Sequence, residues 1–211
     1  MNPREADPRA DREFERLAGW AAILTAIAGA AYAVAFVVLK SAALSALFLL
    51  SAPLASTLVL AALYGRLRSV QPGLARWMFG VALLGAIGAS VHGGYDLANV
   101  LHPPATPSDL PNAVDPRGLL TFGVAGLALL AVSWLMARSG EFPAWTPPAA
   151  LLLGVVLIMT YLARLIVLDA SSLLVLGPAL AAGVLSPLFY LGLGLWFLRG
   201  PASGDRRSSG S

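Results

Sequence analysis

The sequence predicts an all-α integral membrane protein, a bundle of six transmembrane helices. Hydrophobic residues make up 58% of the 211-residue chain and charged residues only 12%, with a mean hydropathy of +0.77. A soluble domain carries about a quarter charged residues, so this chain has too little polar surface to cover a globule in water. The hydrophobic residues also fall into six continuous runs. Each run is long enough, at about 1.5 Å per residue, to cross a hydrocarbon core of about 30 Å.

The runs indicate helices because they lack the alternation over about ten residues that marks a transmembrane strand. The first two, 17–39 and 42–64, are separated only by Lys40 and Ser41, so they form an antiparallel hairpin. Residues 1–16 mix four arginines with five acidic residues. This composition predicts a polar tail rather than a secretory signal, whose first region is basic.

The third helix, 74–101, leads into a link with five prolines between residues 102 and 117. Such a link is typical of a stiff extended cover rather than a folded domain. Asp115-Pro116 and Thr146-Pro147 each place a capping side chain before a proline, and they predict the starts of the fourth and fifth helices. The last three predicted helices cover 119–137, 149–168 and 172–198, and residues 200–211 form a polar tail.

The distribution of basic residues predicts that both termini are cytoplasmic. With the N-terminus inside, eleven of the fourteen Lys and Arg residues lie in inner segments, which is the bias found in membrane proteins. All five tryptophans fall at the inner ends of helices, where an indole ring favours the headgroup level. We therefore expect a multi-pass protein of the cell membrane with the lipid bilayer as its partner. The positive net charge reflects topology, and nucleic-acid binding is not expected.

A polar stripe in the third helix is the main candidate site. His92, Tyr95, Asp96 and Asn99 stand at positions i, i+3, i+4 and i+7, so they share one helix face. A stripe of this kind cannot face lipid without a large cost, and it must face the bundle or water. The other histidine, His102, lies at the water interface and outside this site.

Arg164 in the fifth helix is the predicted partner of Asp96. Apart from Arg76 at the inner end of the third run, it is the single basic residue inside a hydrophobic run. It lies about 6 Å from the outer end of its helix, and Asp96 lies about 7–8 Å from the outer end of the third helix. An unpaired charge at this depth costs about 2.5–3.5 kcal/mol, and the planar guanidinium can meet both carboxylate oxygens. We predict an Asp96–Arg164 pair with Tyr161, one turn deeper, as a neighbour.

Gly93 and Gly94 interrupt the same stripe and have two interpretations. Two glycines inside a span can loosen the helix and expose carbonyls to a cavity, as in discontinuous transporter helices. The favoured interpretation is the close approach of a neighbouring helix.

The sequence predicts no catalytic residue, metal or cofactor. There is no cysteine, a zinc site needs more ligands than the stripe offers, and no HExxH, GxSxG or nucleotide-binding glycine loop occurs. We expect a non-enzymatic protein whose polar site clasps helices or binds a small ligand, a membrane protein partner or a second copy. The alternative is a small-solute or proton-coupled transporter that uses the same site, with His92 as the titrating group. A weaker alternative is a membrane enzyme acting on a lipid.

Overall fold

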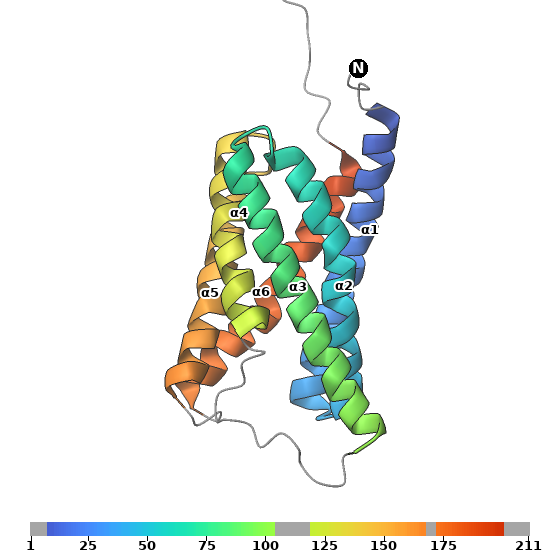
Figure 1. The fold of residues 1–211 in the computed structure, drawn as a ribbon, viewed down its shortest axis with the longest axis vertical. Coiled ribbons are helices and arrows are strands. Elements are labelled where there is room, and N and C mark those ends of the chain that lie inside the picture. The colour runs from blue at the N-terminus through green and yellow to red at the C-terminus, as the bar shows by residue number, and fades with distance from the viewer. Residues whose placement is uncertain (1–7, 104–118, 168–171, 201–211) are drawn as a thin grey trace, which may run out of the picture.

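A computed structural model describes residues 8–103, 119–167 and 172–200, and within these ranges the chain is helical without strands. The elements are α1 (Pro8–Ala33), η1 (Val34–Val38), α2 (Ala42–Leu67), α3 (Pro72–Leu101), η2 (Leu119–Val124), α4 (Ala125–Ser139), α5 (Thr146–Ile166) and α6 (Leu173–Arg199). The segments η1 and η2 are π-helical. η1 continues α1, and η2 precedes α4. Six helices in this part of the chain are long and apolar enough to cross a membrane (Figure 1), which confirms the predicted fold class.

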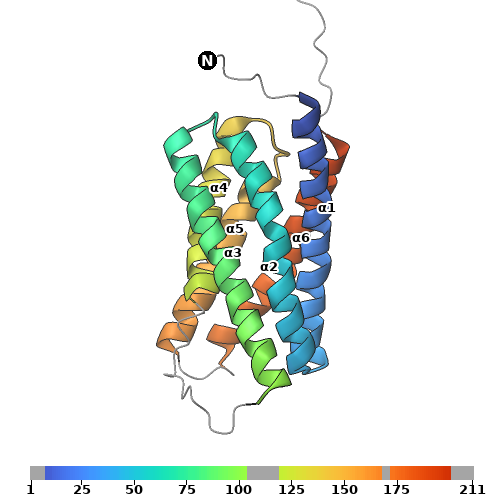
Figure 2. The same cartoon turned by 45° about the vertical axis from the view of Figure 1, so that its right-hand side comes forward.

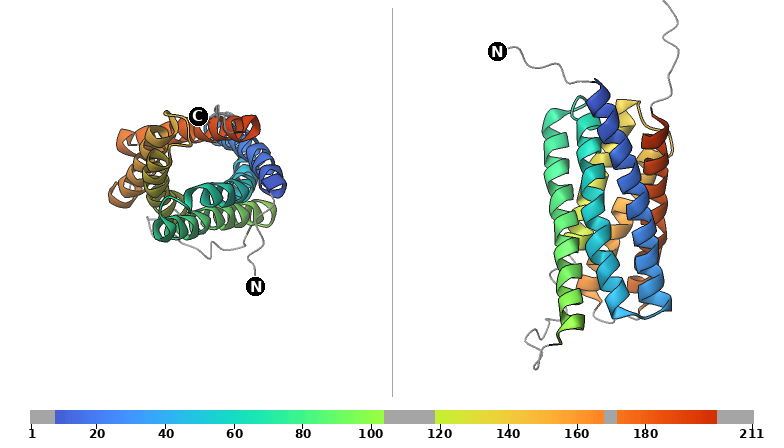
Figure 3. Two further views of the ribbon diagram at one scale, coloured as in Figure 1. Left: turned by 90° about the horizontal axis from the view of Figure 1, so that it is seen from above. Right: turned by 90° about the vertical axis from the view of Figure 1, so that its right-hand side faces the viewer.

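The six helices form a closed ring. Each helix packs against its neighbours in the sequence, and α6 returns to pack against α1. The ring is visible from above in Figure 3. The first described turn of α1 and the last turn of α6 lie at one end, here called the termini end (Figure 2). The η1–α2 link and the last turn of α3 lie at the opposite end, here called the far end.

The ring interior is filled toward the termini end by apolar side chains from all six helices. The largest fully buried side chains there are those of Val59, Leu67, Met78, Val132, Leu135, Met136, Leu153 and Leu193. The small residues Ala18 and Ala22 are also fully buried in this cluster, as close packing of α1 requires. Large apolar side chains such as Leu24, Ile27 and Leu188 lie exposed around the outside. An apolar surface of this extent suits lipid rather than water.

The helices differ from the predicted ones mainly in the residues at which they begin. α1 begins at Pro8 rather than at residue 17, so the polar residues before the hydrophobic run belong to the helix. Thr146 does not cap α5. It is the first residue of the helix, and its Oγ1 donates to the carbonyl of Pro143 at 2.7 Å. Asp115 and the proline-rich link lie outside the described residues.

Glycines set the closest helix contacts. A Cβ built on Gly93 would lie 2.6 Å from the carbonyl carbon of Leu49 and still closer to the backbone nitrogen of Leu50. The helix is continuous at this point, so the close-approach interpretation of Gly93 is confirmed. Pro53 in α2 has no N–H to donate to the carbonyl of Leu49. α3 therefore crosses α2 at the turn where the hydrogen-bond ladder of α2 is interrupted.

Candidate functional site

An open pocket of about 460 Å³ lies at the far end, between the η1–α2 link and the last turns of α3. It is lined by Phe36, Lys40, Ser41, Ala42, Ser45, Asp96, Asn99 and Val100. Two residues of the predicted polar stripe thus face an open space rather than a neighbouring helix. Val100 also comes from α3, and the other lining residues come from the hairpin formed by α1, η1 and α2.

His92 and Asp96 are in contact along α3. His92 Nε2 lies 3.3 Å from Asp96 Oδ2, one helical turn away, and the Asp96 side chain is 39% exposed. Asn99 is one further turn along and lines the pocket with Asp96. Tyr95 is 38% exposed and is not among the lining residues. His102 follows the last turn of α3 and is exposed, as expected of a residue outside the site.

The predicted pair between Asp96 and Arg164 does not form. Arg66 pairs with Glu15 and with Glu141, and Asp96 lies against His92 of its own helix. α3 packs against α2, α4 and η2, whereas α5 packs against α4, α6 and η2, so α4 and η2 separate the two helices. Matched depth fixes a position along the membrane normal only. It leaves the order of helices around the ring undetermined, and Tyr161 and Arg164 stay on a helix that does not reach the stripe.

We expect the effects of Asp96→Ala and Arg164→Ala on the free energy of unfolding to add. Residues that share no contact usually add within about 0.3–0.5 kcal/mol. Thermal melting of the two single variants and the double variant in detergent gives the coupling energy. A coupling above about 1 kcal/mol would show that the two side chains do interact in the folded protein.

Lys40 is a site residue that sequence reasoning treated only as a loop charge. Its φ is +50°, the one positive value found at a non-glycine position among the described residues. A left-handed backbone at such a residue costs about 1–2 kcal/mol. The residue after Lys40 holds the turn in place, because the N–H of Ser41 donates to the carbonyl of Ala35 at 2.9 Å. The sequence signal that could have identified Lys40 as a site residue is a lone lysine in a two-residue link at the level of Asp96.

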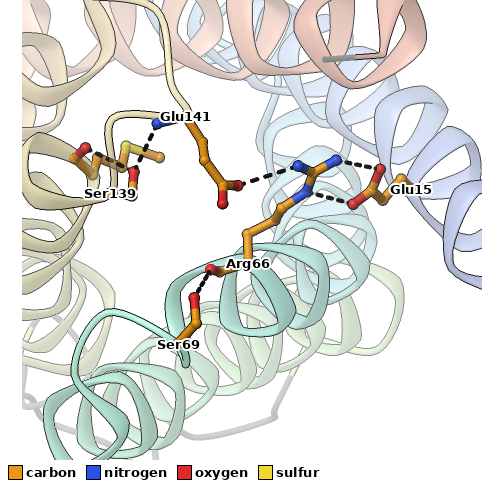
Figure 4. Close-up of polar contacts among 6 residues, drawn as sticks. Glu15, Arg66, Ser69, Ser139 and Glu141 are labelled. Atoms are coloured by element: carbon orange, nitrogen blue, oxygen red, sulfur yellow. Dashed lines mark hydrogen bonds and ion pairs between the residues drawn. The ribbon is translucent and has the colours of Figure 1, made fainter. Parts of the chain in front are cut away.

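A second polar cluster lies at the termini end and was not predicted (Figure 4). Arg66 Nε and Nη2 donate to the two carboxylate oxygens of Glu15 at 2.5 and 2.7 Å, and Nη1 donates to Glu141 at 3.2 Å. The Arg66 guanidinium also lies over the Trp196 ring at 5.5 Å from its centroid. The cluster joins α1, α2, the α4–α5 link and α6. Its members are far apart in the sequence, so no periodicity could reveal it.

No family model, curated protein or solved structure matches this chain. The class of protein therefore rests on the fold, which is that of a multi-pass α-helical membrane protein. Within the described ranges, no three His, Cys, Asp or Glu side chains gather in a group that could hold a metal ion.

Proposed function

We propose that this membrane protein binds a small polar solute in the far-end pocket and that the far end faces outside the cell. The observation that carries the proposal is that Asp96 lines an open pocket with its side chain 39% exposed. A solute that enters the pocket can therefore reach the carboxylate. Pockets for small molecules have volumes of about 300–1,000 Å³, and this pocket lies in that range.

The lining of the pocket suits a zwitterion that carries an ammonium and a carboxylate group. Asp96 brings a carboxylate and Lys40 an ammonium to the lining of one space. Asn99 adds an amide that both donates and accepts hydrogen bonds. Ser45 Oγ donates to the carbonyl of Ser41 at 2.9 Å, which leaves the lone pairs of the hydroxyl oxygen for a donor on the solute. Phe36 and Val100 provide the apolar walls.

The alternative of a lipid-directed enzyme has less support. A hydrolase would need a nucleophile beside His92, and Ser90 is the nearest serine on α3. Its Oγ donates to the carbonyl of Ala86 at 3.0 Å within the same helix, and Ser90 is buried. The hydroxyl is thus occupied by its own backbone rather than directed by the histidine.

Binding of glycine, methylamine and acetate to the purified protein in nanodiscs tests the proposal. We expect glycine to bind more tightly than either fragment. Asp96→Asn should abolish the binding of methylamine. Lys40→Gln should abolish the binding of acetate. Each should weaken glycine binding at least about tenfold, because a hydrogen bond to a charged group contributes about 1.5–3 kcal/mol. Calorimetry provides the measurement.

Two variants at the termini end serve as matched controls. Asp11→Asn and Arg68→Gln make the same charge changes at exposed positions far from the pocket, and they should bind glycine like the wild type. The proposal fails if none of the three probes binds. It also fails if the two pocket variants bind glycine as tightly as the controls.

A further inference from the structure

A second open pocket, of about 410 Å³, lies at the termini end and is lined by Glu141, Phe142, Pro143, Trp196, Arg199 and Gly200. We propose that it binds the headgroup of a zwitterionic phospholipid whose phosphate is esterified to ethanolamine. The headgroup lies between the α4–α5 link and the last turn of α6. This site is at the other end of the ring from the proposed solute pocket and does not depend on it.

The lining of this pocket carries one charge of each sign. Arg199 stands in the last turn of α6 and is exposed, and its planar guanidinium can donate two hydrogen bonds to one phosphate. The Glu141 side chain is 46% exposed and accepts one hydrogen bond of 3.2 Å from Arg66 (Figure 4). An ionised carboxylate has about four lone-pair sites, so Glu141 can also accept from an ammonium. A phosphate ester of ethanolamine carries both groups that this lining recognises.

The surface of α6 beside the pocket favours a lipid over a soluble phosphate ester. Leu188, Leu191 and Leu195 are each at least 39% exposed. They stand three or four residues apart on the helix face that ends at Arg199. An acyl chain can therefore lie along this apolar face while its headgroup reaches Arg199. A phosphate ester without acyl chains would gain nothing from the same face.

Tryptophan residues place the pocket at the headgroup level of the bilayer. Trp196 lines the pocket, and Trp145 packs so closely on α6 that a Cβ built on Gly192 would clash with its ring. An indole ring favours this level because its body is apolar and its N–H needs a partner. The phosphate groups of the lipids lie at the same level.

The aromatic wall of the pocket favours a primary ammonium over a quaternary one. The Trp196 ring already packs against Phe142 and Phe197, with centroid distances of 4.5 and 4.9 Å. The Arg66 guanidinium lies 5.5 Å from the centroid of the same ring. A quaternary ammonium such as choline is bound through aromatic faces, and this ring already has three partners. An ethanolamine ammonium carries three N–H donors instead, and these suit the Glu141 carboxylate.

Native mass spectrometry of the purified full-length protein with added lipids tests the proposal. We expect phosphatidylethanolamine to bind at least about tenfold more tightly than phosphatidylcholine with the same acyl chains. Glu141→Gln should remove this preference by weakening the binding of phosphatidylethanolamine alone. Arg199→Gln should weaken the binding of both lipids about tenfold. Because Arg199 is exposed, this variant should melt like the wild type without added lipid.

Arg138→Gln and Glu13→Gln are the matched controls. Arg138 stands in the last turn of α4, with its guanidinium 4.6 Å from the centroid of the Trp134 ring. It therefore repeats an arginine beside a tryptophan at the same end but outside the pocket. Glu13 is an exposed acid of α1. Both variants should bind phosphatidylethanolamine like the wild type. The proposal is overturned if Arg199→Gln binds it as tightly as Arg138→Gln does, or if the wild type binds the two lipids equally.

Two further ligands distinguish the source of the headgroup. Glycerophosphoethanolamine has the same headgroup without acyl chains, and equal binding of this compound would overturn a lipid occupant in favour of a soluble phosphate ester. Phosphatidylglycerol has the phosphate without an ammonium. If it binds more tightly than phosphatidylethanolamine, the basic surface of this end rather than the charged pair holds lipid, and the proposal fails. None of these measurements uses glycine, so their outcome is separate from that of the far-end solute site.

Discussion

Gly93→Ala is expected to destabilise the bundle by about 3 kcal/mol, the upper end of the range for overpacking a core. The added Cβ would meet the backbone of α2 at Leu49, Leu50 and the carbonyl oxygen of Ala46. Backbone cannot move aside as a flexible side chain can. α3 would have to withdraw from α2 along much of their shared length. Thermal melting in detergent measures the loss.

Gly80→Ala is the control for this change, since Gly80 lies in the same helix and a Cβ there would meet nothing within 4 Å. Replacing a helical glycine with alanine removes backbone freedom from the unfolded chain and stabilises by up to about 1 kcal/mol. The two variants should therefore shift the melting temperature in opposite directions. A common shift would show that the contact of Gly93 with α2 does not limit packing.

Arg66→Gln is expected to lower the free energy of unfolding by about 2 kcal/mol at neutral pH. It leaves the largely covered carboxylate of Glu15 without its cation and removes the tie between α2 and the α4–α5 link. Breaking a fully buried pair costs about 3–5 kcal/mol. The loss is smaller here because about a fifth of each side chain is exposed. Denaturant titration or thermal melting gives the difference.

Two further variants test this explanation. Arg68→Gln removes the same charge from an exposed residue two positions along and should change stability by less than about 0.5 kcal/mol. The double variant Arg66→Gln/Glu15→Gln should recover part of the loss, because it no longer leaves an uncompensated carboxylate. If Arg66→Gln melts like Arg68→Gln, the cluster does not hold the termini end together.

The number and approximate span of the helices followed from hydrophobic runs, because a helix in lipid must satisfy its own backbone and its apolar length must match the membrane. The start of α1 at Pro8 did not follow, since polar turns beyond the membrane carry no such constraint. Periodicity placed His92, Asp96 and Asn99 on one side of α3 correctly, because residues one turn apart must lie together.

Contacts between distant helices could not be predicted in the same way. The Asp96–Arg164 pair followed from matched depth, but depth says nothing about which helices are neighbours in the ring. Glu15, Arg66 and Glu141 belong to separate elements and show no shared spacing. Only the closure of the ring brings them together. Lys40 was missed for a related reason, since the left-handed turn that brings it to the pocket wall has no signature at a lysine.

Contact between α1 and α6 also fixes when this protein can finish folding. The first helix is synthesised long before the last, so its α6-facing surface, which includes Gly19, stays uncovered by protein until α6 has been made. Gly194 of α6 meets the carbonyl of Gly19 so closely that the two helices must seat together in one register. Five helices released by premature termination would form an open arc with Gly19 exposed to lipid. A chain that stops before α6 therefore leaves the Gly19 face of α1 without its partner helix.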